Sequence, residues 1–281
     1  MTMAWIVPLA AGTVAAAVAV ARRAERAQSA SLVAALAEVP TDVGDGNEHV
    51  ADTDLPAPVQ RFFACSLRTG QSRIRRAQFR QTGLLRTGVD SDRWMRFSAT
   101  HTVAPPSFGF VWNARVRMGA GLHIDVCDAL VRGEGSGRAA FMSVVPLASA
   151  HHDPRMTAGA LHRYLAEAAW YPTALLPSAA LRWSPVDAVR ALATLTAHGT
   201  TVALEFRFGA DGAVTGIYTS ARWGRFGSRY EERPWEGRFG RTVERDGMRV
   251  PSEGQVGWYV DDTWRCVWAG RIVASHYTFD A

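Results

Sequence analysis

The sequence predicts a mainly β (α+β) protein: a large curved antiparallel sheet or incomplete β-barrel of about ten strands, a helical segment on its concave side and an N-terminal membrane helix. Three observations predict this class. After residue 73, hydrophobic side chains recur at every second position, as in strands with one buried face. Short turns separate these runs, without long βαβ crossovers, which favours antiparallel pairing. About ten twisted antiparallel strands cannot stay flat, so the sheet is expected to curl.

The composition is that of an ordinary globular protein. The chain has 281 residues, of which 48% are hydrophobic and 20% charged, which excludes disordered, collagen-like and coiled-coil proteins. All 31 basic residues are arginines and the net charge is +5. These arginines are scattered, so no nucleic-acid partner is expected. No Walker, Rossmann or HExxH pattern occurs, and we expect no cofactor.

Metal and disulfide chemistry are not expected either. Cys65, Cys127 and Cys266 form an odd set, far apart, without the spacing of a metal site. Buried free thiols in a reducing compartment are the expected outcome.

Residues 1–28 form the predicted membrane anchor. Residues 3–21 carry no charge, close to the ~20 residues that span a bilayer as a helix. Arg22, Arg23 and Arg26 follow this segment, which predicts a single-pass cell membrane protein with its globular domain in the cytoplasm. A cleaved signal peptide is the rival, because Ala19 and Ala21 form a small-residue pattern. Residues 29–54 then read as an amphipathic stretch and a linker.

The antiparallel β domain is predicted over residues 55–281. It begins with a short helix after Pro56, followed by strand patterns within 77–126. Gly133 to Gly137 is expected to be a turn or bulge. A helical passage over 157–170 interrupts the strands, which resume from residue 192 to residue 277.

Several motifs of this domain resemble a known family. They are Leu55-Pro-Ala-Pro-Val-Gln-Arg61, Phe110-Val-Trp-Asn-Ala-Arg115, Arg163-Tyr-Leu-Ala-Glu-Ala168, Trp170-Tyr-Pro-Thr-Ala-Leu-Leu176, Pro234-Trp-Glu-Gly-Arg238 and Gly247-Met-Arg-Val-Pro251. Together they resemble an uncharacterised bacterial family known only as a domain of unknown function, over about residues 55–272. That resemblance implies no catalytic residues. The last third is also similar to the half-open barrels of lipoprotein carrier proteins, which implies a fold that holds acyl chains.

The helical passage carries the strongest candidate site. Arg163 and Glu167 are four residues apart and Tyr164 and Glu167 three apart, so they share a helix surface near Trp170. At a barrel mouth, Glu167 would act as general acid or base with Tyr164 as a donor. The alternative is an Arg163–Glu167 ion pair that is only structural.

Two strand groups are candidate ligand-binding residues. Asn113 and Arg115 point to the opposite face from Trp112, and with Asp125 and Asp128 they predict a charged pocket floor or cross-strand salt bridges. The second group comprises Trp235, Glu236, Glu253 and Trp258. Tryptophans on a curved sheet either fill its core or line an apolar cavity.

The leading hypothesis is therefore a membrane-tethered protein that binds an apolar small molecule or lipid in its curved sheet. The alternative is a hydrolase- or cyclase-like enzyme that uses Glu167, Tyr164 and Arg163. A third is a structural partner of another membrane protein, which would show an apolar patch on the outer face.

Overall fold

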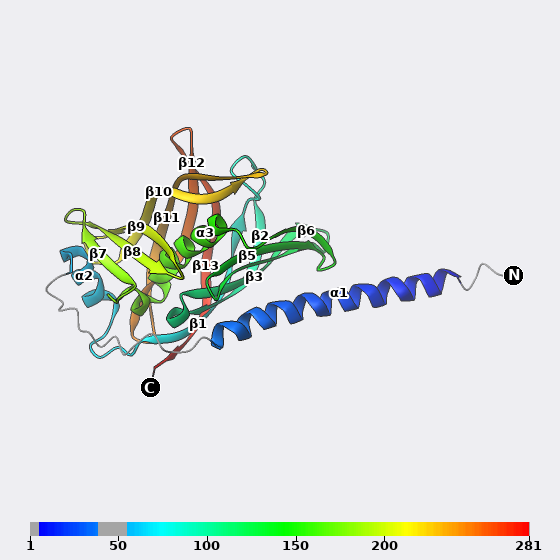
Figure 1. Ribbon diagram of the computed structural model, residues 1–281, viewed down its shortest axis with the longest axis horizontal. Helices are drawn as coiled ribbons and strands as arrows, with labels where there is room; N and C mark the ends of the chain where they lie inside the picture. Colours follow the sequence, from blue (N-terminus) through cyan, green and yellow to red (C-terminus); the bar gives the residue numbers. More distant parts are fainter. Residues whose placement is uncertain (1–5, 39–54, 281) are drawn as a thin grey trace.

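The computed structural model describes residues 6–38 and 55–280, which form three α-helices and one large antiparallel sheet (Figure 1). The mainly β class is thus confirmed, although the sheet has 13 strands and not about ten. The helices are α1 (Ile6–Ala37), α2 (Ala57–Ser66) and α3 (Pro154–Glu167). Two single-turn 3-10 helices, η3 (Ala168–Trp170) and η4 (Pro172–Leu175), follow α3.

The strands form two consecutive meanders that meet in the middle of the sheet. The first meander comprises β1 (Ile74–Leu85), β2 (Met95–Ala104), β3 (Gly109–Gly119), β4 (Leu122–Val131), β5 (Glu134–Phe141) and β6 (Val145–Ala150). The second comprises β7 (Leu181–Pro185), β8 (Arg190–Ala197), β9 (Thr200–Phe208), β10 (Val214–Phe226), β11 (Arg229–Arg245), β12 (Met248–Val260) and β13 (Thr263–Phe279). The order across the sheet is β6-β5-β4-β3-β2-β1-β13-β12-β11-β10-β9-β8-β7, so β6 and β7 are its edges.

The three strands that the sequence patterns did not predict are β5, β6 and β7. The Gly133 to Gly137 segment does not form only a turn, because β5 begins at Glu134 and pairs with β4 along its length. Gly135 is needed there for packing: a Cβ atom would lie 2.8 Å from the backbone nitrogen of Thr157 in α3. Strand β6 is short and exposed, and β7 ends on a proline, so neither shows the alternating pattern of a long strand.

Helix α3 crosses the inner face of the sheet and connects its two edges (Figure 1). Asp153 caps the helix by accepting from the Arg155 backbone N–H at 2.9 Å, and Thr157 Oγ1 accepts from the Gly135 N–H in β5. On the other side, Arg222 in β10 donates to the Gly159 carbonyl at 2.9 Å. The chain between the edge strands is therefore held against both halves of the sheet.

Helix α1 packs on the opposite, outer face. Leu36 is 4% exposed and belongs to a small hydrophobic cluster with Val111, Cys127 and Ala129 of β3 and β4. Arg138 of β5 donates to Glu25 at 2.8 Å. The amphipathic stretch after residue 29 is thus the C-terminal part of one continuous helix.

Among the residues that the structure describes, no helix is both long and apolar enough to cross a membrane. The N-terminal membrane helix is thus not supported. Residues 1–5 of the predicted anchor and residues 39–54 of the predicted linker lie outside the described residues.

One end of the inner face is filled by a packed core. Large side chains from the sheet meet α2, α3 and the 3-10 turns there; they include Phe62, Phe79, Phe110, Leu161, Tyr164, Leu165, Tyr171 and Tyr277. Tyr277 donates to the Trp170 carbonyl at 2.8 Å, and Tyr171 donates to the Tyr164 carbonyl at 2.6 Å. These bonds fix the turns after α3 against the central strands.

A row of glycines crosses the centre of the sheet next to this core. Gly83 pairs with Gly270, which pairs with Gly254. A Cβ atom at Gly83 would lie 2.1 Å from the Ala269 carbonyl oxygen, and one at Gly270 would lie 2.5 Å from the Trp268 ring. Only glycine fits at Gly83, because the nearest obstructing atoms belong to the backbone, and at Gly270 the Trp268 ring occupies the space of a side chain. A Cβ atom at Gly254 would make ordinary contacts of 3.5 Å or more.

Candidate functional site

The other end of the inner face is hollow and contains a cavity of about 570 Å³, called the inner cavity below. Its walls come from β1–β6 on one side, β10–β13 on the other, and α3 with η3 above. Most of its side chains are hydrophobic: Leu85, Met95, Trp112, Val116, Ile124, Val126, Ala139, Leu147, Ala166, Trp170, Ile217, Trp235, Phe239, Val256, Trp258 and Trp268. Leu147 is 53% exposed on the edge strand, so the cavity opens to solvent beside β6.

Charged side chains gather where the cavity meets the packed core. This polar cluster consists of His101, Asp128, Arg163, Glu167 and Arg222. Arg163 is central, because its guanidinium lies 2.9 Å from Glu167 and 3.0 Å from Asp128. The fully buried His101 places Nε2 3.3 Å from Glu167 Oε2.

Burial changes how the cluster titrates. Burial raises the pKa of Glu167, and the nearby positive charge of Arg163 opposes that rise only in part. Burial also lowers the pKa of His101 well below its ordinary value, with Arg163 adding to the effect. The imidazole is therefore neutral at pH 7, and the pair between His101 and Glu167 is a polar contact and not an ion pair.

Arg222 is the cation of the cluster that lacks a carboxylate partner among the described residues. Its guanidinium carbon stacks 4.5 Å above the Trp235 ring and 5.0 Å above the Trp258 ring, which is a favourable cation–π geometry. Burial, followed by the repulsion of Arg163, lowers the pKa of Arg222 to about 9. It still carries its charge at neutral pH.

Most of the sequence-predicted aromatic and helical residues line this one cavity. Trp112, Trp170, Trp235 and Trp258 contribute to its walls, and Arg163 and Glu167 to its polar end. The Arg163–Glu167 pair thus exists, and it also faces the hollow. Tyr164 does not line the cavity: it is 2% exposed in the core, and its hydroxyl donates to the Pro105 carbonyl at 3.2 Å.

Asn113 and Arg115 lie on the outer face, away from the cavity. Arg115 is paired with Asp125 at 3.1 Å and its side chain is 53% exposed. Of the residues predicted to form a charged pocket floor, only Asp128 faces the cavity. It lies three residues after Asp125 on β4, so the two side chains point to opposite faces of the sheet. The cross-strand salt bridge and the inward carboxylate therefore belong to different faces of the sheet.

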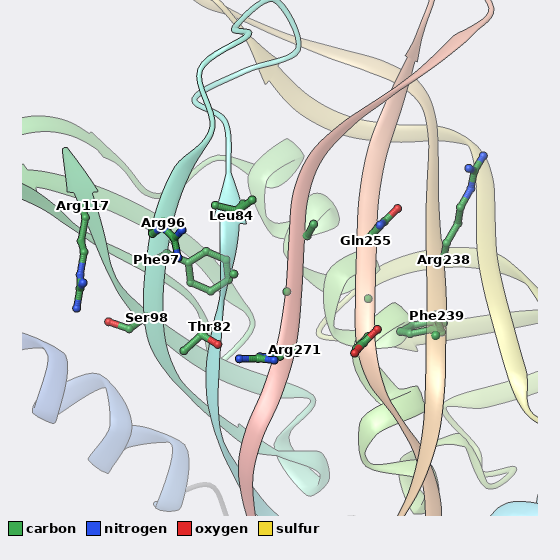
Figure 2. A pocket seen from close by; sticks show the side chains of 16 residues that line it. Thr82, Leu84, Arg96, Phe97, Ser98, Arg117, Arg238, Phe239, Gln255 and Arg271 are labelled. Atoms are coloured by element: carbon green, nitrogen blue, oxygen red, sulfur yellow. The ribbon is translucent and has the colours of Figure 1, made fainter. Parts of the chain in front are cut away.

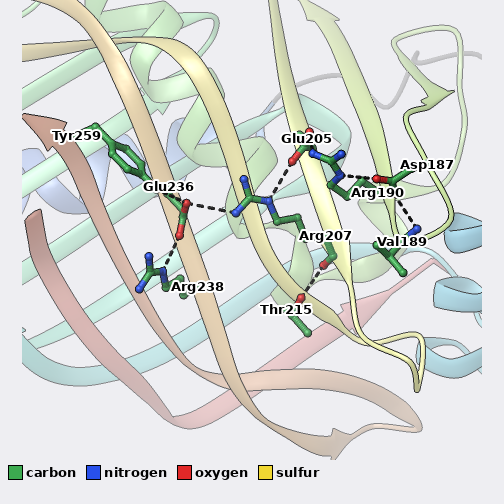
Figure 3. A network of polar contacts seen from close by, with 9 residues as sticks. All are labelled: Asp187, Val189, Arg190, Glu205, Arg207, Thr215, Glu236, Arg238 and Tyr259. Carbon is green, nitrogen blue, oxygen red and sulfur yellow. Dashed lines mark hydrogen bonds and ion pairs between the residues drawn. The ribbon is translucent and has the colours of Figure 1, made fainter. Parts of the chain in front are cut away.

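Glu236 is also outside the cavity, in a network of polar contacts on the outer face (Figure 3). Its carboxylate accepts from Arg238 at 2.6 Å, from Tyr259 at 2.7 Å and from Arg207 at 3.3 Å. Although burial opposes it, the hydrogen bonds from Arg238 and Tyr259 lower the pKa of Glu236. Both carboxylate oxygens of Glu236 thus accept hydrogen bonds from other side chains of the sheet. We therefore assign Glu236 a structural role.

A second hollow, of about 810 Å³, lies over the glycine row and is called the outer groove (Figure 2). Its side chains include Thr82, Arg96, Ser98, Arg117, Arg238 and Arg271. Arg96, Arg117 and Arg271 are exposed surface residues. The groove is therefore a shallow, solvated surface in contrast to the inner cavity.

Sequence reasoning missed His101, Arg222 and Trp268. His101 stands in a strand of alternating buried residues, where a buried histidine looks like any core residue. Arg222 follows a register shift in the pairing of β10 with β11, so simple alternation does not assign its face. The approach of both to Glu167 depends on sheet curvature, which no local pattern encodes.

Several solved structures are similar to the chain, among them the following three. One is a domain described as an outer membrane lipoprotein-sorting protein from Vibrio parahaemolyticus, with 8% identity and a TM-score of 0.41 over 81% of this chain and 93% of that chain. Another is a LolA superfamily protein from Nitrosomonas europaea, with 6% identity and a TM-score of 0.39 over 79% and 93%. The third, with 9% identity and a TM-score of 0.30 over 73% and 99%, is a β-barrel-like protein of domain of unknown function DUF1849 from Brucella abortus.

No curated protein matches the chain in sequence. A family model does match, over residues 47–270, and this range contains the six motifs that suggested a family of unknown function. The chain belongs to a family of unknown function, DUF6544.

Proposed function

We propose that the protein binds an apolar, lipid-like small molecule in the inner cavity. The observation that carries this proposal is the cavity itself, about 570 Å³ of space with predominantly hydrophobic walls. Small-molecule sites typically measure roughly 300–1,000 Å³ and combine apolar walls with a few polar groups. Apolar ligand surface buried there would contribute about 25 cal/mol per Å².

The tryptophans support the same proposal. Trp112 donates its indole N–H to Gln81 Oε1 at 2.8 Å, so its ring presents only apolar surface to the cavity. Trp258 and Trp268 are only partly buried although they pack against the core. Large rings that remain partly exposed inside a hollow are available to contact a ligand.

A matched pair of variants tests the proposal. Ala139 and Ala140 are successive residues of β5, so their side chains point to opposite faces, and only Ala139 lines the cavity. The uncharged apolar fluorophore N-phenyl-1-naphthylamine is titrated into the full chain. We expect Ala139→Trp to weaken its binding by at least about tenfold, because the new ring fills the space, whereas Ala140→Trp leaves binding unchanged.

The melting temperatures of both variants show whether each still folds. Equal binding by the two variants, or no binding of the fluorophore to the unmodified protein, would contradict the proposal. Native mass spectrometry of the detergent-extracted protein then gives the mass of any ligand that co-purifies.

Hydrolase- or cyclase-like activity is a second candidate, favoured by the Glu167 carboxyl at the cavity with its raised pKa. Such a carboxyl suits a general acid or base, and Arg163 would position it. Tyr164 has no part, because its hydroxyl points into the core. Incubating the co-purified ligand with the protein and with Glu167→Gln tests this: a ligand unchanged in both mass and chromatographic retention in the two samples rejects such an activity on it.

Anchoring to the cell membrane through residues 1–28, with the domain in the cytoplasm, remains a separate proposal. It predicts that the full chain sediments with membranes and that a chain starting at residue 29 does not.

A further inference from the structure

Four buried polar atoms on side chains that line the inner cavity have no hydrogen-bond partner among the described residues. One is Arg86 Nε, just after β1, whose guanidinium stacks 4.4 Å from the Trp94 ring. The other three are Trp170 Nε1, Arg222 Nε and Glu167 Oε2, and the last of these lies 3.3 Å from His101 Nε2. Trp170 is only 3% exposed. A buried donor or acceptor left unpaired costs about 1–3 kcal/mol. A ligand that forms hydrogen bonds with these atoms removes that cost and binds more tightly for it.

The three atoms belong to one polar end of the cavity. Glu167 and Trp170 are three residues apart where α3 passes into the 3-10 turn η3, and side chains at that spacing lie on the same side of a 3-10 turn. Arg222 approaches from β10, and its charge acts on Glu167. The site thus offers two N–H donors and one carboxylate acceptor.

The charges of this end already balance. Glu167 is surrounded by Arg163 on its own helix, His101 from β2, Asp128 from β4, Arg222 from β10 and the phenol of Tyr171. Two arginines face two carboxylates, and His101 is neutral. A head group of fixed negative charge would therefore add an uncompensated buried charge, and a cationic head group would meet Arg222; both are costly.

An undissociated carboxyl group pairs all three atoms without adding charge. Its carbonyl oxygen accepts from the Arg222 and Trp170 N–H groups, and its O–H donates to Glu167 Oε2. We infer that the ligand is a long-chain carboxylic acid whose head group shares a single proton with Glu167. This inference rests on the proposed function and specifies the ligand class of the same cavity.

Proton sharing makes binding depend on pH. Carboxyl groups in water ionise near pH 4 (about 4.3 for a Glu side chain), so above the pKa values of both partners the free ligand and free Glu167 are ionised. The complex then takes up one proton on binding, because two carboxylates in contact do not both stay ionised. The affinity for the acid falls up to about tenfold for each pH unit in that range.

The test compares three probes on the full chain: dodecanoic acid, dodecan-1-ol and methyl dodecanoate, titrated from pH 6 to pH 8, where Arg222 with its pKa of about 9 keeps its charge. We expect the acid alone to lose affinity as the pH rises. In Glu167→Gln the cluster has one negative charge less, so the carboxylate anion binds and the pH dependence disappears. Glu253→Gln, an exposed carboxylate outside the cavity, is the matched control and keeps the slope of the unmodified protein.

A second variant tests the inference independently, in case Glu167→Gln does not fold. Trp170→Phe keeps an aromatic ring but removes the N–H donor, so we expect about three- to tenfold weaker binding of the acid, the equivalent of one hydrogen bond. Binding of N-phenyl-1-naphthylamine, which needs no head-group contact, stays unchanged.

The outcomes separate the two proposals. If the ester and the fluorophore bind while the acid shows no pH dependence, or the same dependence in Glu167→Gln, the inference is overturned and the apolar site stands. If neither the three probes nor the fluorophore binds to the unmodified protein, the proposed function itself fails.

Discussion

The two ends of the inner face differ in how their aromatic rings are packed although the same strands run through both. At the packed end, Phe79 of β1 and Phe110 of β3 meet Tyr171 and leave no large space. At the hollow end, Trp258 and Trp268 line the cavity and stay only partly buried although their rings are larger. Rings at one end pack against other rings, and rings at the other end border open space. The cavity is therefore not the result of small side chains alone.

The polar cluster marks the boundary between these ends. Its Arg163 guanidinium stacks 5.0 Å from the rings of both Phe110, on the packed side, and Trp112, on the hollow side. Charges at such a boundary are desolvated by the core and open to the cavity. The three predictions below test this contrast, beginning with the largest expected effect.

Removing a ring should cost far more stability at the packed end. Phe79→Ala, at a residue with no exposed surface, is expected to lower the free energy of unfolding by about 3–5 kcal/mol, because it leaves a void in a filled core. Trp268→Ala removes a larger ring, yet we expect at most about 2 kcal/mol, since that ring borders existing space. Urea unfolding of both variants measures the difference, and equal losses would contradict the contrast.

Breaking the boundary cluster should have an intermediate effect. Arg163→Met leaves Asp128 and Glu167 without their shared cation, and removing one partner of a fully buried pair costs roughly 3–5 kcal/mol. Because Arg163 is 20% and Asp128 41% exposed, we expect about 2–4 kcal/mol. The exposed pair of Arg132 with Glu38 supplies the control, and Arg132→Met should change the unfolding free energy by no more than about 1 kcal/mol. A similar loss of unfolding free energy in both variants would contradict the prediction that the buried cluster contributes more than an exposed ion pair.

The smallest effect concerns pH. Burial raises the pKa of Glu167 above its value of about 4.3 in an unfolded chain. Its protonated form therefore stabilises the fold below that pH, and this contribution is lost as the pH rises through the folded-state pKa. Relative to Glu167→Gln, the unmodified protein should lose up to about 1.4 kcal/mol for each pH unit within this interval. Parallel stability curves from pH 4 to pH 7 would show that Glu167 is not desolvated.

Much of the fold could be predicted from the sequence, because long strands with one buried face alternate visibly. The run of alternating residues in β3 is an example. Strand β5 was not predicted because its glycines are typical of a turn. Gly135 instead allows α3 to pack closely against the strand. The count of strands failed at the sheet edge, where β6 is short and exposed.

The site was only partly predictable for a physical reason. Helical spacing correctly brought Arg163 and Glu167 together, since partners four residues apart meet on any helix. The same spacing wrongly included Tyr164, which points into the core. His101 and Arg222 reach the cluster from strands far apart in the chain, and their approach depends on how the sheet curves.

The pairing of β1 with β13 at the centre of the sheet has a consequence for folding. Each meander has mostly local contacts, but the two meanders are joined by the pairing of β1 with β13, in which Ile74 lies opposite Phe279. These two strands cannot pair until β13 has been synthesised. Before that moment, both halves present a bare central edge, which is open to mispairing with another nascent chain. The order of the strands thus makes completion of the sheet a late event and the time before it a window of aggregation risk.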